Sequence, residues 1–452
     1  MCKYSILFAA IVSTVFALVY GSILSMNNTS LGVVTANWID SGSLLASYHN
    51  MLTSGDFNQN HHYHASAYGW PYNSLVIAVL ELTEFIKGRP TIVQEQAFTA
   101  RLVSFLFSLL SLIAAGYLFS MHKFNKVLII LSLVTIATFS GFTKLSYTIK
   151  PEAFGLFCSF SSLIALSIYC KGSQHPSPLY LGWGFAILAT LAKQPYLVYL
   201  IPPLVIGFHP MSRSPAKLRL SRAFGFILIA FVAVFISHPY AILDLTGFIE
   251  VQVLHQTAVF TGQRELMVVV GEWMHTIGYH APWFGLAVIL SAIFLVLPQR
   301  INFGSLFVSA ALSNLLFLAL LIAAMGFTAF YGYLYPIIPA AFFVILSAST
   351  YVTAQVLNYI IATVLLVSIV SGSHISVATV KADATFSEGP EMEIVNALRS
   401  GNHASHSIVF TISLPVSAAD YREAYGHFTL SRGLELVDQL KRISPDIIVV
   451  DN

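Results

Sequence analysis

Long apolar runs alternate with short polar connections along the first 372 residues of the chain. Most of these runs approach the roughly 20 residues that an α-helix needs to cross the hydrocarbon core of a bilayer. The pattern therefore predicts an all-α polytopic membrane domain with about eleven transmembrane helices. We expect the spans at residues 5–25 and near residues 99–120, 126–143, 152–170, 178–192, 196–208, 223–242, 282–297, 304–325, 331–348 and 353–372.

The first apolar run, residues 5–25, follows Lys3 and has two interpretations. It is either a secretory signal peptide or an uncleaved first helix. A typical signal peptide has an apolar region of about 7–15 residues, which is shorter than this run. We therefore expect an anchor that stays in the membrane.

Two further stretches are typical of helices that lie along a membrane surface. Residues 75–86 are moderately apolar and contain two glutamates, which disfavour a span. Residues 245–260 carry apolar side chains at helical spacing. Both stretches fall in the two longest connections, residues 27–98 and 239–282.

The composition changes completely after the last predicted span. Residues 373–452 are charged and contain no spanning run. Strand-like residues 407–414 and 446–450 flank a helix-like segment, residues 430–443. We expect a small α/β domain here, a kind of appendage that is more often structural or substrate-shielding than catalytic.

Composition supports a membrane protein. Only 9% of the residues are charged and 56% are hydrophobic, so the chain cannot cover itself with polar surface in water. The formal net charge of +2 gives no broad basic field, which argues against nucleic acid as a partner. The three cysteines have no disulfide-framework or CxxC spacing.

Lysine and arginine in short connections set the orientation, because these residues are preferentially retained in the cytoplasm. A cytoplasmic N-terminus places both long connections and the C-terminal domain on the outer face. We expect an integral multi-pass protein, and the compact C-terminal domain favours a bacterial inner membrane over an endoplasmic reticulum. The cytoplasmic basic residues would be Lys123, Lys126, Lys171, Arg213, Lys217, Arg219, Arg222 and Arg300.

The first long connection contains two groups that could carry chemistry. Asp40 lies just beyond the first span, where a general base could act on an acceptor hydroxyl, although an aspartate here could simply cap a helix at residues 41–52. His61, His62 and His64 could bind Zn²⁺, or they could form a solvated turn. We expect no required cofactor, and a divalent metal is possible but has no further support in the sequence.

Other ionisable and aromatic residues cluster at predicted helix ends. Lys150 and Glu152 lie at a helix mouth, where ionisable groups are costly, so we expect them to line a wet cavity. Lys193 interrupts an apolar stretch and either extends to the membrane interface or binds an anion. Tyr333 belongs to a tyrosine-rich helix end, which is typical of an aromatic belt or of a contact with a sugar or lipid headgroup.

The order of these features resembles the GT-C superfamily of membrane glycosyltransferases, especially the branch of protein O-mannosyltransferases and the aminoarabinose transferase. The resemblance covers roughly residues 5–350 and lacks a diagnostic catalytic signature. Two features depart from the family pattern: Asp40 is followed by Ser41 instead of a glutamate, and Tyr333 stands where an arginine is common. The matching segments are Asp40 with its following helix, residues 68–75, Arg101-Leu102, residues 146–152, 188–203, 239–244 and 333–339.

The resemblance implies transfer of a sugar from a polyprenyl or dolichyl phosphate to a glycolipid, glycan or protein acceptor on the outer face, by a metal-independent inverting displacement. Asp40 would deprotonate or orient the acceptor hydroxyl, and Glu152 would position the acceptor or a cation. One of three cations would offset the charge of the leaving phosphate, namely Arg101, Lys150 or Lys193. Three other residues would line the cavity, namely His238, Asp244 and Tyr333.

Two other classes of function fit the same composition. A secondary transporter also combines apolar helices with a few ionisable residues, but transporters often contain internal repeats and charges near the membrane midplane, and the sequence has no visible repeat. A non-catalytic membrane assembly protein, in which Asp40 only caps a helix, is the third interpretation.

Overall fold

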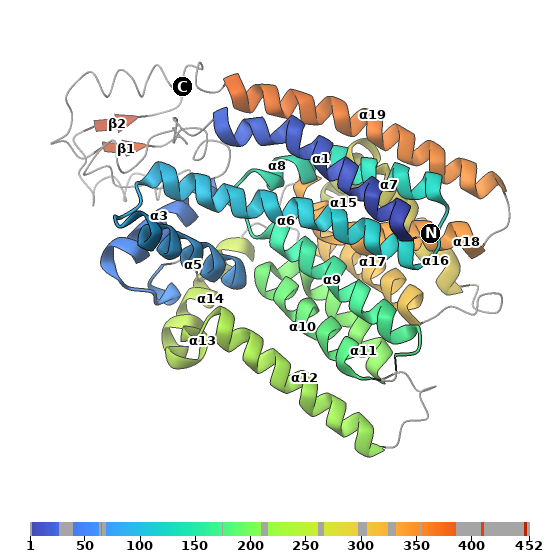
Figure 1. Ribbon diagram of the computed structural model, residues 1–452, viewed down its shortest axis with the longest axis horizontal. Helices are drawn as coiled ribbons and strands as arrows, with labels where there is room; N and C mark the ends of the chain where they lie inside the picture. The colour runs from blue at the N-terminus through green and yellow to red at the C-terminus, as the bar shows by residue number, and fades with distance from the viewer. Residues whose placement is uncertain are drawn as a thin grey trace.

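A computed structural model of the chain is predominantly helical (Figure 1). It describes residues 2–26, 39–62, 65, 69–173, 175–208, 216–260, 266–296, 305–323, 331–351, 355–385, 408–410 and 447–449.

The first half of the chain forms α1 (Cys2–Met26), α3 (Ile39–Ser54), the short 3-10 helix η1 (Gln59–His61), α5 (Trp70–Lys87), α6 (Val93–Met121), α7 (Lys126–Thr138), α8 (Ser140–Ser146), α9 (Glu152–Cys170), α10 (Ser177–Ala192), η2 (Gln194–Leu200) and α11 (Ile201–Phe208). The second half forms α12 (Ala216–Ser237), α13 (Tyr240–Leu243), α14 (Leu245–Phe260), α15 (Leu266–His280), α16 (Pro282–Val296), α17 (Ser305–Ala323), η4 (Tyr331–Ile337), α18 (Ile338–Tyr351), α19 (Gln355–Thr385), β1 (Ile408–Phe410) and β2 (Ile447–Val449).

Six described helices are long and apolar enough to cross a membrane, and the number rises to eight if each of two bent helix pairs is one span. The chain therefore has the character of a multi-pass membrane protein. Three more apolar helices are shorter, namely Leu7–Gly21, Ser177–Ala192 and Gln194–Phe208. The predicted positions of the long spans agree with these helices to within several residues.

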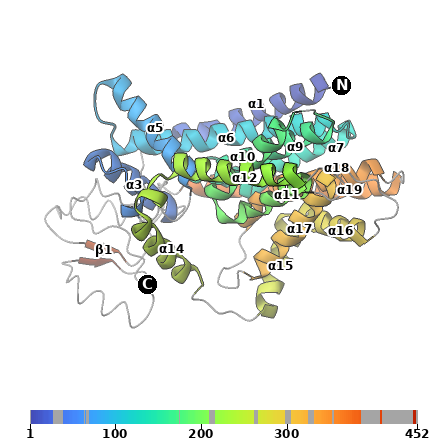
Figure 2. The ribbon, with the colours of Figure 1, turned by 90° about the horizontal axis from the view of Figure 1, so that it is seen from below.

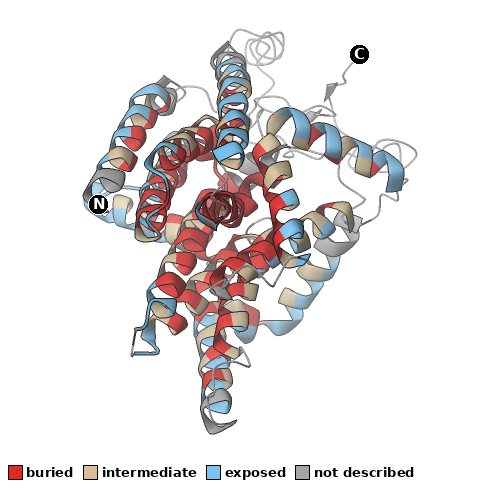
Figure 3. Cartoon of the chain, turned by 90° about the vertical axis from the view of Figure 1, so that its right-hand side faces the viewer, coloured by how far each residue is buried: buried red, intermediate tan, exposed pale blue. Residues whose placement is uncertain are grey.

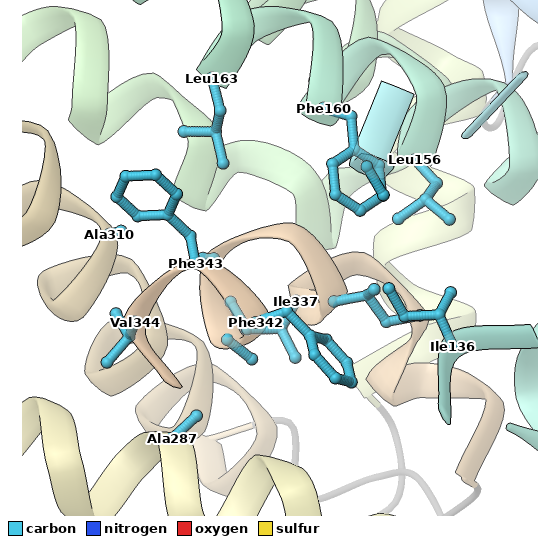
Figure 4. Packing of buried hydrophobic residues seen from close by; sticks show 14 of the residues in the cluster. Ile136, Leu156, Phe160, Leu163, Ala287, Ala310, Ile337, Phe342, Phe343 and Val344 are labelled. Carbon is cyan, nitrogen blue, oxygen red and sulfur yellow. The ribbon is translucent and has the colours of Figure 1, made fainter. Parts of the chain in front are cut away.

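The core is built around the last turns of η4 and the helix α18. Of the residues in Tyr333–Thr350, 89% are buried, whereas only 17% are buried in Leu220–Ser237 of α12. Figure 3 shows buried residues where the helices face one another and exposed residues on the outer helices. Figure 4 shows side chains of α18 packed against α9, α16 and α17, among them Phe342, Phe343, Val344, Leu156, Phe160, Leu163, Ala287 and Ala310.

Elements from the long connections gather at one end of the bundle. α3, α5, α13, β1 and β2 lie at this end, opposite to the N-terminal end of α1 (Figure 1). We call it the loop end. The view from below shows the same separation (Figure 2). α3 and α5 share a small second core against α6, built from residues such as Leu44, Tyr48, Tyr72 and Val76.

Three predicted spans differ from the helices in detail, and each difference has a local cause. The span predicted at residues 223–242 ends at Ser237, because a residue that precedes proline, here His238, is disfavoured in a helix. The span predicted at residues 126–143 is bent by 56° between α7 and α8. The segment at residues 331–348 begins as the 3-10 helix η4, which contains Pro336.

The second long connection contains more helix than predicted. α14 matches the expected surface helix at residues 245–260. α15 was not predicted, and it meets α16 at an angle of 111°. The sequence of α15 contains Glu272, His275 and His280 among its apolar residues, so its apolar pattern falls short of a span.

The predicted C-terminal domain begins inside α19, because this helix continues past residue 372 to Thr385. The other described residues of that domain form a pair of strands. β1 and β2 pair in parallel with Ile408 opposite Ile447. Both strands lie inside the strand-like segments of the sequence. The helix predicted at residues 430–443 lies outside the described residues.

Candidate functional site

Glu152 lies in the first turn of α9, and the segment before it is fixed by bonds to α6. Arg101 donates from Nε to the carbonyl of Tyr147 at 2.8 Å, and Ser104 donates from Oγ to the carbonyl of Lys150 at 3.2 Å. Pro151 precedes the helix. These contacts hold the turn from Tyr147 to Glu152 against α6. The bond from Arg101 to Tyr147 thus positions the backbone of this turn.

Lys193 reaches the same place from another helix. It ends α10 in an extended conformation, because Pro195 prevents the helix from continuing. Its ammonium forms an ion pair with Oε1 of Glu152, and it lies 5.9 Å from the centre of the Tyr333 ring. The structure therefore brings together three residues that the sequence singled out separately, Glu152, Lys193 and Tyr333.

One buried tyrosine, Tyr196, bonds to the backbone of Glu152, and a second, Tyr199, lies beside it with a ring-centroid distance of 6.3 Å. Tyr196 donates its hydroxyl to the backbone carbonyl of Glu152 at 2.7 Å, and Tyr199 donates to the carbonyl of Pro336 at 2.8 Å. Gly155 is required beside Tyr196, because a Cβ at this position would come within 2.6 Å of the tyrosine ring. Neither tyrosine was predicted as a site residue. Their position directly after Lys193 is the signal that could have pointed to them.

The first connection covers the turn that leads to Glu152. Gly69, with a φ of 81°, begins α5 close enough to Pro151 that an added Cβ would lie 3.2 Å from its Cγ. Tyr72 donates its hydroxyl to the carbonyl of Ala100 at 2.9 Å. Ile149 belongs to the small core shared by α3 and α5. The site thus lies at the loop end, beneath α3 and α5.

Asp40 is placed by its backbone only. α3 begins at Ile39, so Asp40 lies in the first turn of that helix. Its side chain lies outside the described residues, and both of its predicted roles stay predictions. Lys150 is buried, with 1% of its surface exposed.

Asp244 belongs to a second group that joins the first connection to the second. Asn60 and Asn58 each donate from Nδ2 to Oδ2 of Asp244 at 3.1 Å, and the backbone amide of Gly247 donates to Oδ1 at 3.2 Å. These bonds lower the pKa of the Asp244 carboxyl, with Asn60 contributing most. The group docks η1 on the turn between α13 and α14.

His238 is the buried member of this second group. Its ring packs edge-on against Trp70 and Phe248, at centroid distances of 5.0 and 5.8 Å. Burial lowers the pKa of His238 to about 4, so the ring is neutral at pH 7. Asn58 and Asn60 were not predicted, although two asparagines and a glutamine in succession are an unusual polar run in so apolar a chain.

The predicted histidine group forms hydrogen bonds with Asp56. His61 bonds through Nδ1 to the Asp56 carboxylate at 2.6 Å, and His62 bonds to the Asp56 carbonyl at 3.2 Å. The first bond raises the pKa of His61 and lowers that of Asp56. Within the described ranges no three His, Cys, Asp or Glu side chains are grouped as metal ligands. His64 lies outside the described residues.

Comparison with known proteins adds no family to this description. The sequence matches no protein-family model and no curated protein. The residues at the loop end themselves define the candidate chemistry. There, a buried carboxylate is paired with a cation from another helix, beneath the elements that carry Asp40.

Proposed function

We propose that the protein is a membrane glycosyltransferase that moves a sugar from a polyprenyl or dolichyl phosphate to a glycolipid, glycan or protein acceptor at the outer face. The observation that carries the proposal is the ion pair between Glu152 and Lys193 at the loop end. Ionisable groups in an apolar helix bundle are costly, and they mark functional sites more often than structural ones. The same end holds the long connections and the first turn of α3 with Asp40.

Asp40, Glu152 and Lys193 each have a role in such a reaction. Asp40 accepts the proton of the acceptor hydroxyl as that oxygen attacks the anomeric carbon of the sugar. The bond between the sugar and the lipid phosphate breaks, and the phosphate leaves with an added negative charge. Lys193 stabilises that charge, and Glu152 holds Lys193 in place until the donor arrives.

The proposal includes a topology. The three shorter apolar helices would also cross the membrane, which would give about eleven spans with the N-terminus in the cytoplasm. The loop end would then face the periplasm of a bacterium, and the C-terminal segment would lie there as a small α/β domain.

A secondary transporter is the second candidate, and the broken helices favour it. Two helix pairs are bent by 56° and 111°, and interrupted spans are common at transporter binding sites. In a transporter, however, the coupled charges usually lie near the membrane midplane. Here Glu152 and Lys193 lie at helix ends.

The test is sugar transfer from radiolabelled polyprenyl-phosphate sugars into lipid or polymer acceptors, in membranes with equal amounts of wild-type protein, Asp40→Asn or Asp56→Asn. Asp56 is the matched control, because it lies in the same connection but bonds to His61. Transfer that is lost in Asp40→Asn and kept in Asp56→Asn supports the proposal. Equal transfer in all three rejects Asp40 as the base, and an absence of transfer with every donor favours the transporter.

A further inference from the structure

The ion pair between Glu152 and Lys193 joins two helices. Glu152 lies in the first turn of α9, whereas Lys193 follows α10 in an extended conformation. Both side chains are long and have several rotatable bonds, so a salt bridge between them does not by itself fix the distance between the two backbones. The pair keeps one geometry only where other contacts hold the two backbone segments in place.

Tyr196 makes two such contacts. Its backbone amide donates to the carbonyl of Lys193 at 3.0 Å, so the start of η2 folds back on Lys193. Its side chain crosses to α9 and donates the phenolic hydroxyl to the backbone carbonyl of Glu152 at 2.7 Å. The ion pair and these two hydrogen bonds form a closed ring of contacts through Glu152, Lys193 and Tyr196.

Gly155 lets the Tyr196 ring reach this position. It follows Glu152 by three residues, which places both residues on the same face of α9. A Cβ at residue 155 would come within 2.6 Å of Cε2 and 2.8 Å of Cζ of Tyr196, whose ring is completely buried. Cζ carries the hydroxyl, so such a Cβ would displace the group that bonds to Glu152. The hydrogen bond from Tyr196 therefore depends on this glycine.

We propose that Tyr196 is a positioning residue for the proposed reaction. It holds the backbones of Glu152 and Lys193 together, so that the lysine ammonium stays aimed at the place where charge develops on the leaving phosphate. A charge that is fixed in advance needs no rearrangement during the reaction. The part that concerns the phosphate rests on the proposed function, whereas the control of the ion pair by Tyr196 rests on the contacts alone.

A purely structural role is the alternative, because any buried, hydrogen-bonded tyrosine stabilises a fold. Tyr199 is the matched control. It also lies in η2 and is completely buried, and it donates its hydroxyl to the carbonyl of Pro336 at 2.8 Å. Tyr196→Phe and Tyr199→Phe should therefore both lower the unfolding temperature. They should differ in their effect on the ion pair.

The first measurement is the coupling between the two charges, obtained from unfolding of the full-length protein in mild detergent. Glu152→Gln, Lys193→Met and the double variant are compared in the wild-type, Tyr196→Phe and Tyr199→Phe backgrounds. Substitutions of two interacting residues have non-additive effects on stability. This non-additivity should shrink toward zero in the Tyr196→Phe background, whereas in the Tyr199→Phe background it should match that of the wild type.

The second measurement needs no charge variant, because it follows acetylation of Lys193 in the folded protein. The Lys193 side chain is 19% exposed. An amine paired with a carboxylate reacts slowly with acylating reagents, because pairing favours the protonated form. After brief treatment with acetic anhydride, mass spectrometry should show several-fold more acetylation of Lys193 in Tyr196→Phe than in the wild type or Tyr199→Phe. Gly155→Ala should have the same effect, because it displaces the Tyr196 ring and keeps the hydroxyl.

Sugar transfer separates this inference from the proposed function. With a donor that the wild type accepts, Tyr196→Phe should lower kcat by about 10- to 100-fold, and Tyr199→Phe should stay near the wild type. An unchanged coupling, unchanged acetylation or an unchanged kcat in Tyr196→Phe would overturn the positioning role, as would equal changes in the two phenylalanine variants. An absence of transfer with every donor would instead reject the proposed function, and the control of the ion pair by Tyr196 would stand on the first two measurements.

Discussion

Lys193, the residue that follows α10, forms an ion pair with Glu152, in the first turn of α9. Only 19% of the lysine side chain and 5% of the glutamate side chain are exposed. Removing two charges from water is costly, and their mutual attraction offsets this cost only while both partners are present. The pair therefore affects both the proposed reaction and the stability of the fold.

Lys193→Met should be strongly destabilising, because it leaves the Glu152 carboxylate buried without its cation. The expected loss is about 3–5 kcal/mol of unfolding free energy. Glu152→Gln with Lys193→Met removes both charges and should recover most of that loss. Unfolding in mild detergent checks this, and a double variant no more stable than Lys193→Met would show that the pair is not coupled.

The contact between η1 and the α13–α14 turn should weaken in acid. The pKa of the Asp244 carboxyl is lowered by Asn60 and Asn58, so the ionised form stabilises the docked state. That stabilisation is complete above the ordinary pKa of about 4 and is lost as pH falls through the lowered value. His61 has the opposite sign, because its pKa is raised and its contribution is lost as pH rises. Its side chain is 59% exposed, so its effect should be small.

Hydrogen-exchange protection factors for residues 56–62 measure this docking. Wild-type protection should fall below about pH 4. Asp244→Ala should show low protection at every pH, whereas His61→Ala should differ little from the wild type. Protection in Asp244→Ala that matches the wild type at pH 7 would contradict the docking role of Asp244.

The sequence predicted the membrane class and most long helices, because apolar runs of spanning length are strong signals. It did not predict the breaks. α12 ends before His238-Pro239, and α7 stops at Thr138, where no proline or glycine follows directly. At the second break the free carbonyl of Thr138 accepts a hydrogen bond from Ser376 at 3.0 Å, a residue 238 positions later in the chain. Such long-range compensation cannot be read from local pattern.

The candidate site was predicted in part. Lys193, Glu152 and Tyr333 were each singled out because charged and aromatic residues at helix ends are conspicuous in an apolar chain. Their meeting depends on the packing of α9, α10 and η4, which the sequence does not specify. Asn58 and Asn60 were missed because their role is to bond to Asp244, which lies 186 and 184 residues further along the chain.

The end of α5 should insert into lipid. Phe85 is 84% exposed and Ile86 is 74% exposed, beside the start of α6. The neighbouring cations Lys87 and Arg89 both pair with Glu95, which offsets one of their two positive charges. Phe85→Trp in vesicles of brominated lipid should lose much of its added fluorescence. Ser54→Trp, at the exposed end of α3, is the control that should not be quenched. Equal quenching of the two would contradict insertion.

Gly372 should be required where α19 crosses the break between α7 and α8. A Cβ at this position would lie 2.6 Å from the carbonyl oxygen of Thr138, which is backbone and cannot rotate away. Gly372→Ala should therefore push α19 outward and weaken the bond from Ser376, at a cost of about 1–3 kcal/mol of unfolding free energy.

The matched control is Gly271→Ala in α15, where an added Cβ meets nothing within 4 Å. Because alanine favours a helix, this control should be neutral or stabilise by up to about 1 kcal/mol. The measurement is the unfolding temperature, which should be lower for Gly372→Ala than for Gly271→Ala. Equal unfolding temperatures would mean that the close approach of α19 to Thr138 does not constrain the fold.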